Sequence, residues 1–208
     1  MILYWVLRVL LRAIFLGLVR VRVEGAGHLP RKGGVVLCSN HISWLDPLLL
    51  GALLPRRLFY MTKVEAFASP AASAVLRTVG AFPVHRHRGD RRALRHALDL
   101  LESGRIVTVF PEGTRSRDGR LGRAEPGAAL LAAWSGKPIV PVAISGRYGP
   151  GRLTLRCGAP FELRLPEGRK PSSAELHAIA EDQIMGAVRA LLEEPRAGRG
   201  SRVAMGRA

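Results

Sequence analysis

Short apolar runs alternate along the chain with longer segments of helical spacing. Gly34 to Ser39 is typical of a fully buried strand, whereas Val19 to Glu24 alternates apolar and charged residues, as an exposed edge strand does. Further strands are predicted in four apolar runs, at Leu58 to Met61, Ala81 to Val84, Ile106 to Phe110 and Ile139 to Ile144. Helices are predicted between most of them, notably at Asp90 to Ser103 and Ala128 to Ser135. Strands that alternate with helices predict an α/β layer fold.

The last predicted helix begins at a capping box formed by Ser172 and Glu175. Its buried face is predicted to hold residues at i, i+4 spacing: Leu176, Ala180, Ile184, Val188 and Leu191. From Pro195 onward the chain is basic and poor in apolar residues, which predicts a disordered tail over residues 195–208. No linker divides the rest, so one domain is expected over residues 20–194, after an N-terminal helix at residues 1–19.

Met1 to Val19 is nearly all apolar and, as a helix, almost long enough to cross a bilayer core of about 30 Å. Arg8 and Arg12 argue against crossing, since each would cost roughly 2.5–3.5 kcal/mol at mid-bilayer depth. We therefore expect a helix that lies in the membrane surface, with Trp5 and Phe15 among the acyl chains and both arginines reaching headgroups. A buried core helix is the alternative, and the interrupting arginines disfavour a signal peptide.

The charge balance draws the protein to polyanions, because 32 Lys and Arg oppose 16 Asp and Glu for a formal charge of +16. Nucleic acid and anionic lipid both qualify as partners. Cys38 and Cys157 lie in strand-like runs without metal-type spacing, which favours free buried thiols in a reducing compartment.

The first segment with chemical promise is Ser39 to Leu50, where a buried strand leads to Asn40 and His41 and then to Asp46. On one straight helix, residues five apart diverge, so contact between His41 and Asp46 requires a bend, and Pro47 supplies one if Asp46 caps the helix that follows. Asp46 would then fix the imidazole tautomer and leave the other ring nitrogen free as a base. A capping Asp beside an unrelated His is the alternative.

Three further segments follow predicted strands. Gly80 to Arg88 ends in a basic cluster in which Arg86 is the inward guanidinium at strand spacing, and Lys137 to Gly146 is a strand that Pro141 breaks, forming a wall. Val109 to Gly122 carries Glu112, Gly113, Thr114 and Arg115 in a turn. Gly113 allows close backbone approach, Arg115 suits phosphate, and Glu112 can orient that Arg or a hydroxyl group.

Other signals are weak. The G-x-G at Gly25 and Gly27 is followed by no helix, and His85 and His87 sit among arginines that would repel a cation, so neither a nucleotide cofactor nor a metal is predicted. No serine lies in a G-x-S-x-G elbow, which speaks against a covalent acyl-enzyme.

Taken together, four blocks resemble the glycerolipid acyltransferase family in order and spacing. They are N-H-x-x-x-x-D at Asn40 to Asp46, G-x-F-P-V-x-R at Gly80 to Arg86, F-P-E-G-T-R-S at Phe110 to Ser116, and I-V-P-V at Ile139 to Val142. The bacterial lysophosphatidic acid acyltransferase branch is the most similar. The resemblance covers Val21 to Gly146 and implies a mixed central sheet flanked by helices.

The resemblance also implies the roles of the site residues. His41 and Asp46 would be the catalytic pair, and Arg86, Glu112 and Arg115, with Gly113, Thr114 and a more loosely matched Lys63, would bind the acceptor's glycerol phosphate. The donor would be acyl-CoA or acyl-carrier protein. Backbone N–H groups of the His41 turn are candidates for an oxyanion hole.

The expected activity is transfer of an acyl chain to 1-acyl-sn-glycerol-3-phosphate, giving phosphatidic acid at the cytoplasmic face of the cell membrane. Another lyso-lipid or glycerol 3-phosphate is the alternative acceptor. A basic nucleic-acid-binding module is the alternative from a different class, although no stacking platform, helix-turn-helix or zinc spacing supports it.

Overall fold

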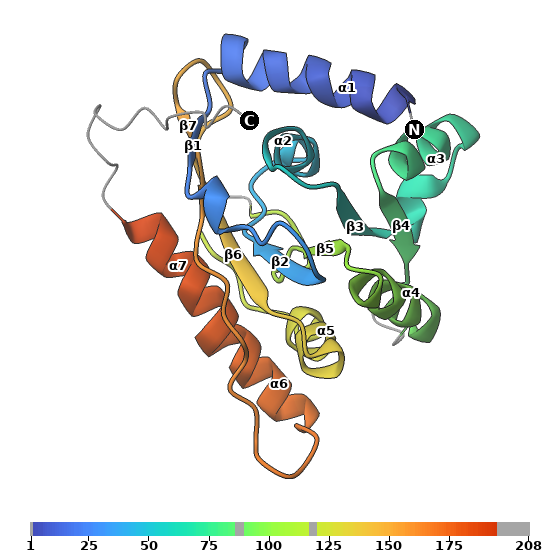
Figure 1. Ribbon diagram of the computed structural model, residues 1–208, viewed down its shortest axis with the longest axis vertical. Helices are drawn as coiled ribbons and strands as arrows, with labels where there is room; N and C mark the ends of the chain where they lie inside the picture. The colour runs from blue at the N-terminus through green and yellow to red at the C-terminus, as the bar shows by residue number, and fades with distance from the viewer. Residues whose placement is uncertain (1, 86–89, 117–119, 195–208) are drawn as a thin grey trace.

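The computed structural model describes residues 2–85, 90–116 and 120–194 of the 208. Within these ranges seven strands form one sheet in the order β1-β7-β6-β2-β5-β3-β4 (Figure 1). Their bounds are β1 (Arg22–Glu24), β2 (Val35–Ser39), β3 (Leu58–Lys63), β4 (Ala81–Val84), β5 (Ile106–Val109), β6 (Ile139–Gly146) and β7 (Leu153–Cys157). Neighbouring strands are parallel except for the antiparallel pair β6 and β7, so the sheet is mixed, as expected.

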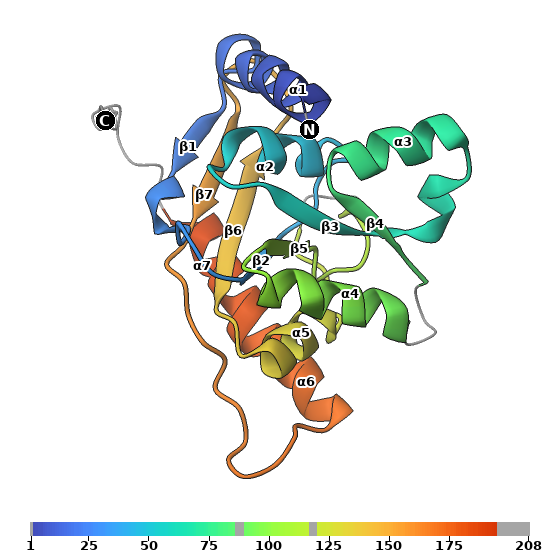
Figure 2. The ribbon, with the colours of Figure 1, turned by 45° about the vertical axis from the view of Figure 1, so that its right-hand side comes forward.

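Helices cover both faces of the sheet, with α1 and α2 on one side and α4, α5, α6 and α7 on the other (Figures 1 and 2). Their bounds are α1 (Ile2–Ala13), α2 (Asp46–Leu53), α3 (Pro70–Thr78), α4 (Arg91–Glu102), α5 (Gly127–Ser135), α6 (Ser173–Ile179) and α7 (Gly186–Glu193). Short π-helical segments follow α1 at Ile14–Leu18 and join α6 to α7 at Ala180–Met185, and 3₁₀ turns lie at Ala26–His28 and Val64–Phe67. The fold is an α/β sandwich of three layers.

Strand β2 shows why both faces need covering. All five of its residues are buried, and they alternate between two cores: Val35 and Leu37 pack on the α2 side, and Val36 and Cys38 pack on the α5 side. A strand that is apolar on both faces is stable only between two helical layers, which confirms the prediction of a fully buried strand. The alternating run near residue 22 is an edge strand, as predicted, because β1 pairs only with β7 among the strands described.

Three local predictions need correction. Pro141 does not break its strand, because β6 continues through it. The ladder with β7 starts only at the next residue, Val142, so the N–H that proline lacks is not needed to pair with β7. Strand β7 was absent from the predicted strands. The last helix has the predicted capping box but passes through a π-helical segment, and Leu191 is only half-buried.

The N-terminal helix packs one face against the domain and exposes apolar residues on the other face. Tyr4 and Phe15 are 7% and 3% exposed. Phe15 therefore lies in the core rather than among acyl chains. The outer face exposes Ile2, Leu3, Trp5, Val6, Val9 and Leu10. Among the described residues, no helix has the length and apolar character needed to cross a bilayer.

The two arginines of α1 also differ from expectation, because they reach the end of α2 rather than headgroups. Arg8 donates a hydrogen bond to the carbonyl of Leu54, and Arg12 donates one of 3.2 Å to the carbonyl of Leu53. The last carbonyls of a helix lack partners within the helix itself, so these guanidinium groups satisfy acceptors that would otherwise be unpaired. The helix α1 is thus an integral part of the domain, with an apolar surface left over.

Candidate active site

Four loops meet at one edge of the sheet. His41 follows β2, Glu112 follows β5, Lys63 ends β3, and Tyr148 follows β6. Because these four strands are mutually parallel, their carboxyl ends lie on the same side of the molecule. The crevice at the carboxyl edge of an open α/β sheet is where ligands usually bind.

The bend that the sequence required between His41 and Asp46 is present. The Nδ1 atom of His41 lies 2.7 Å from Oδ2 of Asp46, and the same oxygen accepts the backbone N–H groups of Ile42 at 2.7 Å and Ser43 at 2.8 Å. The carboxylate is fully buried. The sequence predicted that Asp46 caps α2, but Asp46 is the first residue of that helix and its side chain binds the preceding turn instead. Burial of a carboxylate requires such donors, because an unpaired charge there would be very costly.

The arrangement leaves one nitrogen of the imidazole, Nε2, available to accept a proton. An ionised carboxylate can only accept, so the proton lies on Nδ1 and Nε2 has a free lone pair. In the described parts of the chain, Nε2 makes no hydrogen bond. The ring stacks on Phe110, with centroids 4.1 Å apart and planes inclined by 21°, and the side chain is 16% exposed. His41 is therefore a base held in one tautomer and one orientation.

Glu112 links the turn that carries His41 to the loop after β5. Its Oε1 atom accepts the His41 backbone N–H at 2.9 Å, and its Oε2 atom accepts that of Gly122 at 2.9 Å. The backbone N–H of Ser116 returns a hydrogen bond of 2.8 Å to the His41 carbonyl. The carboxylate thus fixes the backbone of the base, and its predicted contact with an acceptor stays a prediction.

These bonds rule out three of the backbone N–H groups that were expected to form an oxyanion hole. The backbone N–H groups of His41, Ile42 and Ser43 all point to carboxylate oxygens of Glu112 or Asp46. A donor already bound to a buried carboxylate is not available to a developing oxyanion.

The other predicted binding residues surround this turn. Gly113 has φ of +64°, a conformation that glycine adopts without strain, and its N–H closes the turn on the Phe110 carbonyl. Thr114 and Arg115 are exposed, between two residues that bind the backbone of His41. Lys63 is exposed at the end of β3, on the far side of β5 from β2. Arg86 lies outside the described residues.

Two more side chains hold the site together: sequence reasoning named Asn40 without giving it a role, and it missed Tyr148. The side-chain amide of Asn40 donates a hydrogen bond of 2.9 Å to the Ile144 carbonyl and accepts one of 2.8 Å from the Ile144 N–H. These two bonds extend the contact between β2 and β6 by one residue. The hydroxyl of Tyr148 donates 2.6 Å to Oδ1 of Asp46. A signal existed for both, since each follows the end of a strand, but it becomes specific only once β6 is known to neighbour β2.

Thiol and metal chemistry find no support at this edge. Cys38 and Cys157 are free and buried, and burial raises the pKa of Cys157 to about 12 and that of Cys38 further, so neither thiol is a ready nucleophile. Across the ranges that the structure describes, no group of His, Cys, Asp and Glu is arranged to hold a metal ion; His87 lies outside them.

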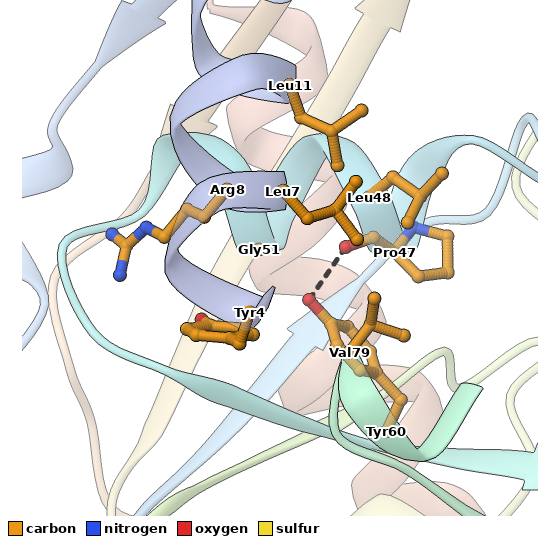
Figure 3. Close-up of a pocket in the computed structure, with 9 residues that line it drawn as sticks. All are labelled: Tyr4, Leu7, Arg8, Leu11, Pro47, Leu48, Gly51, Tyr60 and Val79. Atoms are coloured by element: carbon orange, nitrogen blue, oxygen red, sulfur yellow. Dashed lines mark hydrogen bonds between the residues drawn. The ribbon is translucent and has the colours of Figure 1, made fainter. Parts of the chain in front are cut away.

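A small, partly open apolar pocket lies between α1 and α2 (Figure 3). Leu7 and Leu11 of α1, Leu48 of α2 and Val79 line it. Tyr60 of β3 closes one side, and its hydroxyl donates 2.7 Å to the Pro47 carbonyl, the dashed line in the figure. The residue after the buried Asp46 is thereby anchored as well.

Comparison with known proteins gives concordant matches. Residues 20–145 match the family described as Acyltransferase. The chain is 32% identical over 169 residues to 1-acyl-sn-glycerol-3-phosphate acyltransferase of Bacillus subtilis, covering 77% of this chain and 83% of that protein. It is 35% identical to the lyso-ornithine lipid O-acyltransferase of Pseudomonas aeruginosa, over 60% of this chain and 48% of that one.

The fold is also similar to a solved structure, the crystal structure of the 1-acyl-sn-glycerophosphate acyltransferase PlsC from Thermotoga maritima. The TM-score is 0.64 at 27% identity, over 85% of this chain and 74% of the other.

The Asn40 bridge generates a testable prediction about stability. Asn40→Ala removes both partners of a buried backbone pair at Ile144, so the free energy of unfolding should fall by about 1–3 kcal/mol for each unsatisfied group. Urea unfolding followed by circular dichroism measures it. Ser135→Ala, which loses a hydroxyl bond within α5, is a control expected to lose less. An Asn40→Ala protein as stable as the wild type would show that the bridge does not support the site.

Proposed function

The chain belongs to the Acyltransferase family, and we propose that it transfers a fatty acyl chain from acyl-CoA or acyl-carrier protein to the free hydroxyl of 1-acyl-sn-glycerol-3-phosphate, giving phosphatidic acid. The relatives in Bacillus subtilis and Thermotoga maritima bear names that specify this acceptor, which supports an acyltransferase of phospholipid synthesis. The single observation that carries the mechanism is the His41–Asp46 contact at 2.7 Å with Nε2 left free.

The reaction we infer is direct transfer. Nε2 of His41 takes the proton of the acceptor hydroxyl as its oxygen attacks the thioester carbonyl, and the C–S bond breaks to release the thiolate. Asp46 stabilises the imidazolium that forms. The thiolate needs little acid help, because a thiol is already far more acidic than an alcohol, and it can recover the proton from His41. Neither a cofactor nor a metal takes part in this scheme.

Phosphate recognition is assigned to Arg115, together with Arg86. Arg115 is exposed and lies one residue from Ser116, whose N–H binds the His41 carbonyl. A guanidinium in that place can grip a phosphate while the hydroxyl to be acylated approaches the imidazole. Lys63 and Thr114 are further candidates at the same edge of the sheet.

A different lyso-lipid is the second candidate acceptor, favoured by the similarity to the lyso-ornithine lipid enzyme. A panel of lyso-lipid acceptors separates the two. The match to the Acyltransferase family over residues 20–145 favours an acyltransferase over a nucleic-acid-binding module. Anionic lipid is a sufficient partner for the positive charge.

Membrane attachment is assigned to the outer face of α1. The exposed apolar residues there would enter the acyl boundary of the cytoplasmic leaflet, while basic residues elsewhere add attraction to anionic lipid. This places the helix in the membrane surface, with its inner face still packed on the domain.

His41→Ala should leave a folded protein whose transfer rate falls by roughly 10²–10⁴, the usual loss when a general base is removed. The measurement is turnover of lysophosphatidic acid with each thioester donor, with circular dichroism to verify folding. His177→Ala, at an exposed histidine of α6, is the matched control and should keep wild-type turnover. Near wild-type turnover in His41→Ala would contradict the proposed role of His41 as the base.

Arg115→Ala should lower kcat/KM for lysophosphatidic acid by about ten- to a hundredfold, since one charged hydrogen-bonding partner contributes about 1.5–3 kcal/mol. A monoacylglycerol lacks the phosphate, so its smaller kcat/KM should change little. Arg115→Lys should recover part of the loss. Arg95→Ala, at an exposed arginine of α4, is the control. Equal losses for both acceptors would show that Arg115 does not recognise the phosphate.

The membrane assignment is tested best by substitution, because deleting α1 would also remove Phe15, Arg8 and Arg12 from their contacts. A triple variant, Leu3→Ser, Val6→Ser and Leu10→Ser, changes only outward-facing residues. It should move the protein from pelleted anionic vesicles to the supernatant, because each buried aliphatic side chain contributes about 1.5–3 kcal/mol.

The control for the membrane test is Trp134→Ser, an exposed apolar residue of α5 on the other side of the sheet. It should not alter sedimentation. If the triple variant folds and still pellets completely, α1 is not the attachment surface.

A further inference from the structure

We propose that Tyr148 is a positioning residue of the active site, which fixes the Asp46 carboxylate and, through it, the orientation and basicity of His41. The inference rests on the proposed role of His41 as the base. None of the four motif blocks contains Tyr148, which lies two residues beyond the end of β6.

The geometry divides the Asp46 carboxylate between two sets of donors. Oδ2 receives the imidazole and two backbone N–H groups from its own turn, whereas Oδ1 receives the Tyr148 hydroxyl at 2.6 Å. The carboxylate has no exposure to water, so no solvent molecule at the surface can replace that donor. Among the described residues, Tyr148 supplies the hydrogen bond to Oδ1, so together with the donors to Oδ2 it fixes both oxygens of the carboxylate.

The phenol is suited to act as a permanent donor. Burial, followed by the negative charge of Asp46 and the hydrogen bond to it, raises the pKa of Tyr148 well above the usual value for tyrosine. The hydroxyl therefore keeps its proton throughout the pH range in which a histidine titrates. In this role Tyr148 donates a hydrogen bond to Asp46 throughout turnover and does not transfer its proton.

The turn that carries Tyr148 is fixed from both sides. Gly146 adopts φ of +99°, and a Cβ there would lie 1.8 Å from the Arg152 carbonyl oxygen, so only glycine allows the chain to close so tightly. The N–H of Arg147 donates 3.2 Å to the same carbonyl, and the N–H of Gly151 donates 2.7 Å to the Val19 carbonyl at the end of the N-terminal helical segment. Figure 1 shows this turn beside that end of α1.

In the part of the chain that the structure describes, two other ionisable groups bind the backbone next to the pair. Glu112, from the loop after β5, binds the His41 backbone N–H, and Tyr60 of β3 binds the Pro47 carbonyl rather than the carboxylate. Both contacts would persist if the Tyr148 hydroxyl were lost. That loss would leave more negative charge on Oδ2, which faces the imidazole, and the ring would hold a proton more tightly.

The test is Tyr148→Phe, which removes one oxygen atom and keeps the ring. We expect kcat to fall roughly 5- to 50-fold, with KM for lysophosphatidic acid within about twofold of wild type, because the lost bond holds the base rather than the substrate. The acidic limb of the pH–rate profile should move up by about 0.5–1 pH unit. The sign follows from the tighter proton: His41 then becomes a free base only at higher pH.

Tyr60→Phe is the matched control, since it removes a tyrosine hydroxyl that binds the carbonyl of Pro47, the residue after Asp46, and does not contact the carboxylate. It should not shift the acidic limb. If Tyr148→Phe keeps the wild-type kcat and pH profile, or only lowers the melting temperature, the inference is wrong and Tyr148 is structural. His41→Ala measured in parallel separates the two hypotheses: activity that survives in that variant would overturn the base itself.

Discussion

The site is organised by a carboxylate that has been removed from water. Asp46 is fully buried, and a charge in that position is stable only if donors surround it. Four of them do so, and three come from the turn that begins with His41. The fourth, Tyr148, comes from the loop that follows the neighbouring strand β6. Satisfying the charge forces the chain to fold back on itself after β2, and that fold places the imidazole against its partner.

The same requirement explains why the turn that carries His41 is held by several hydrogen bonds. Three of its N–H groups are shared between two carboxylates, Asp46 within the turn and Glu112 from the loop after the neighbouring strand β5. Phe110 lies against the ring, so the imidazole is held by a stacking contact as well as by hydrogen bonds. A base that is fixed before the substrate arrives does not have to be ordered during the reaction, which is how a preoriented group lowers the barrier.

Much of this could be predicted from the sequence. The apolar runs located five of the strands and an alternating run located β1. The spacing from His41 to Asp46, with Pro47 after it, indicated a bend. Strand β7 was harder, because it is fully buried yet contains Thr154 and Arg156. Arg156 is tolerated there because Glu24 of β1 lies 2.5 Å away, a pairing between residues far apart in the chain. A rule based on apolar runs does not detect a buried strand whose charge is neutralised by a distant partner.

The missed site residues share that difficulty. Asn40 and Tyr148 act across the boundary between β2 and β6, and the order of strands in a sheet is not written in the local pattern of either strand. The arginines of α1 were misassigned for a related reason. Their spacing showed that they share one face of the helix, but not that the end of another helix would lie opposite.

Helix α2 has a consequence for how attachment and catalysis are connected. It begins with the anionic Asp46 and ends at carbonyls that receive Arg8 and Arg12. A helix carries partial positive charge at its first turn and partial negative charge at its last, so both ends of α2 meet the sign that complements its macrodipole. The helix that carries the proposed catalytic carboxylate thus has its last carbonyls paired by the helix that we assign to the bilayer surface. We expect a displacement of α1 to alter the charge at the far end of α2 from Asp46.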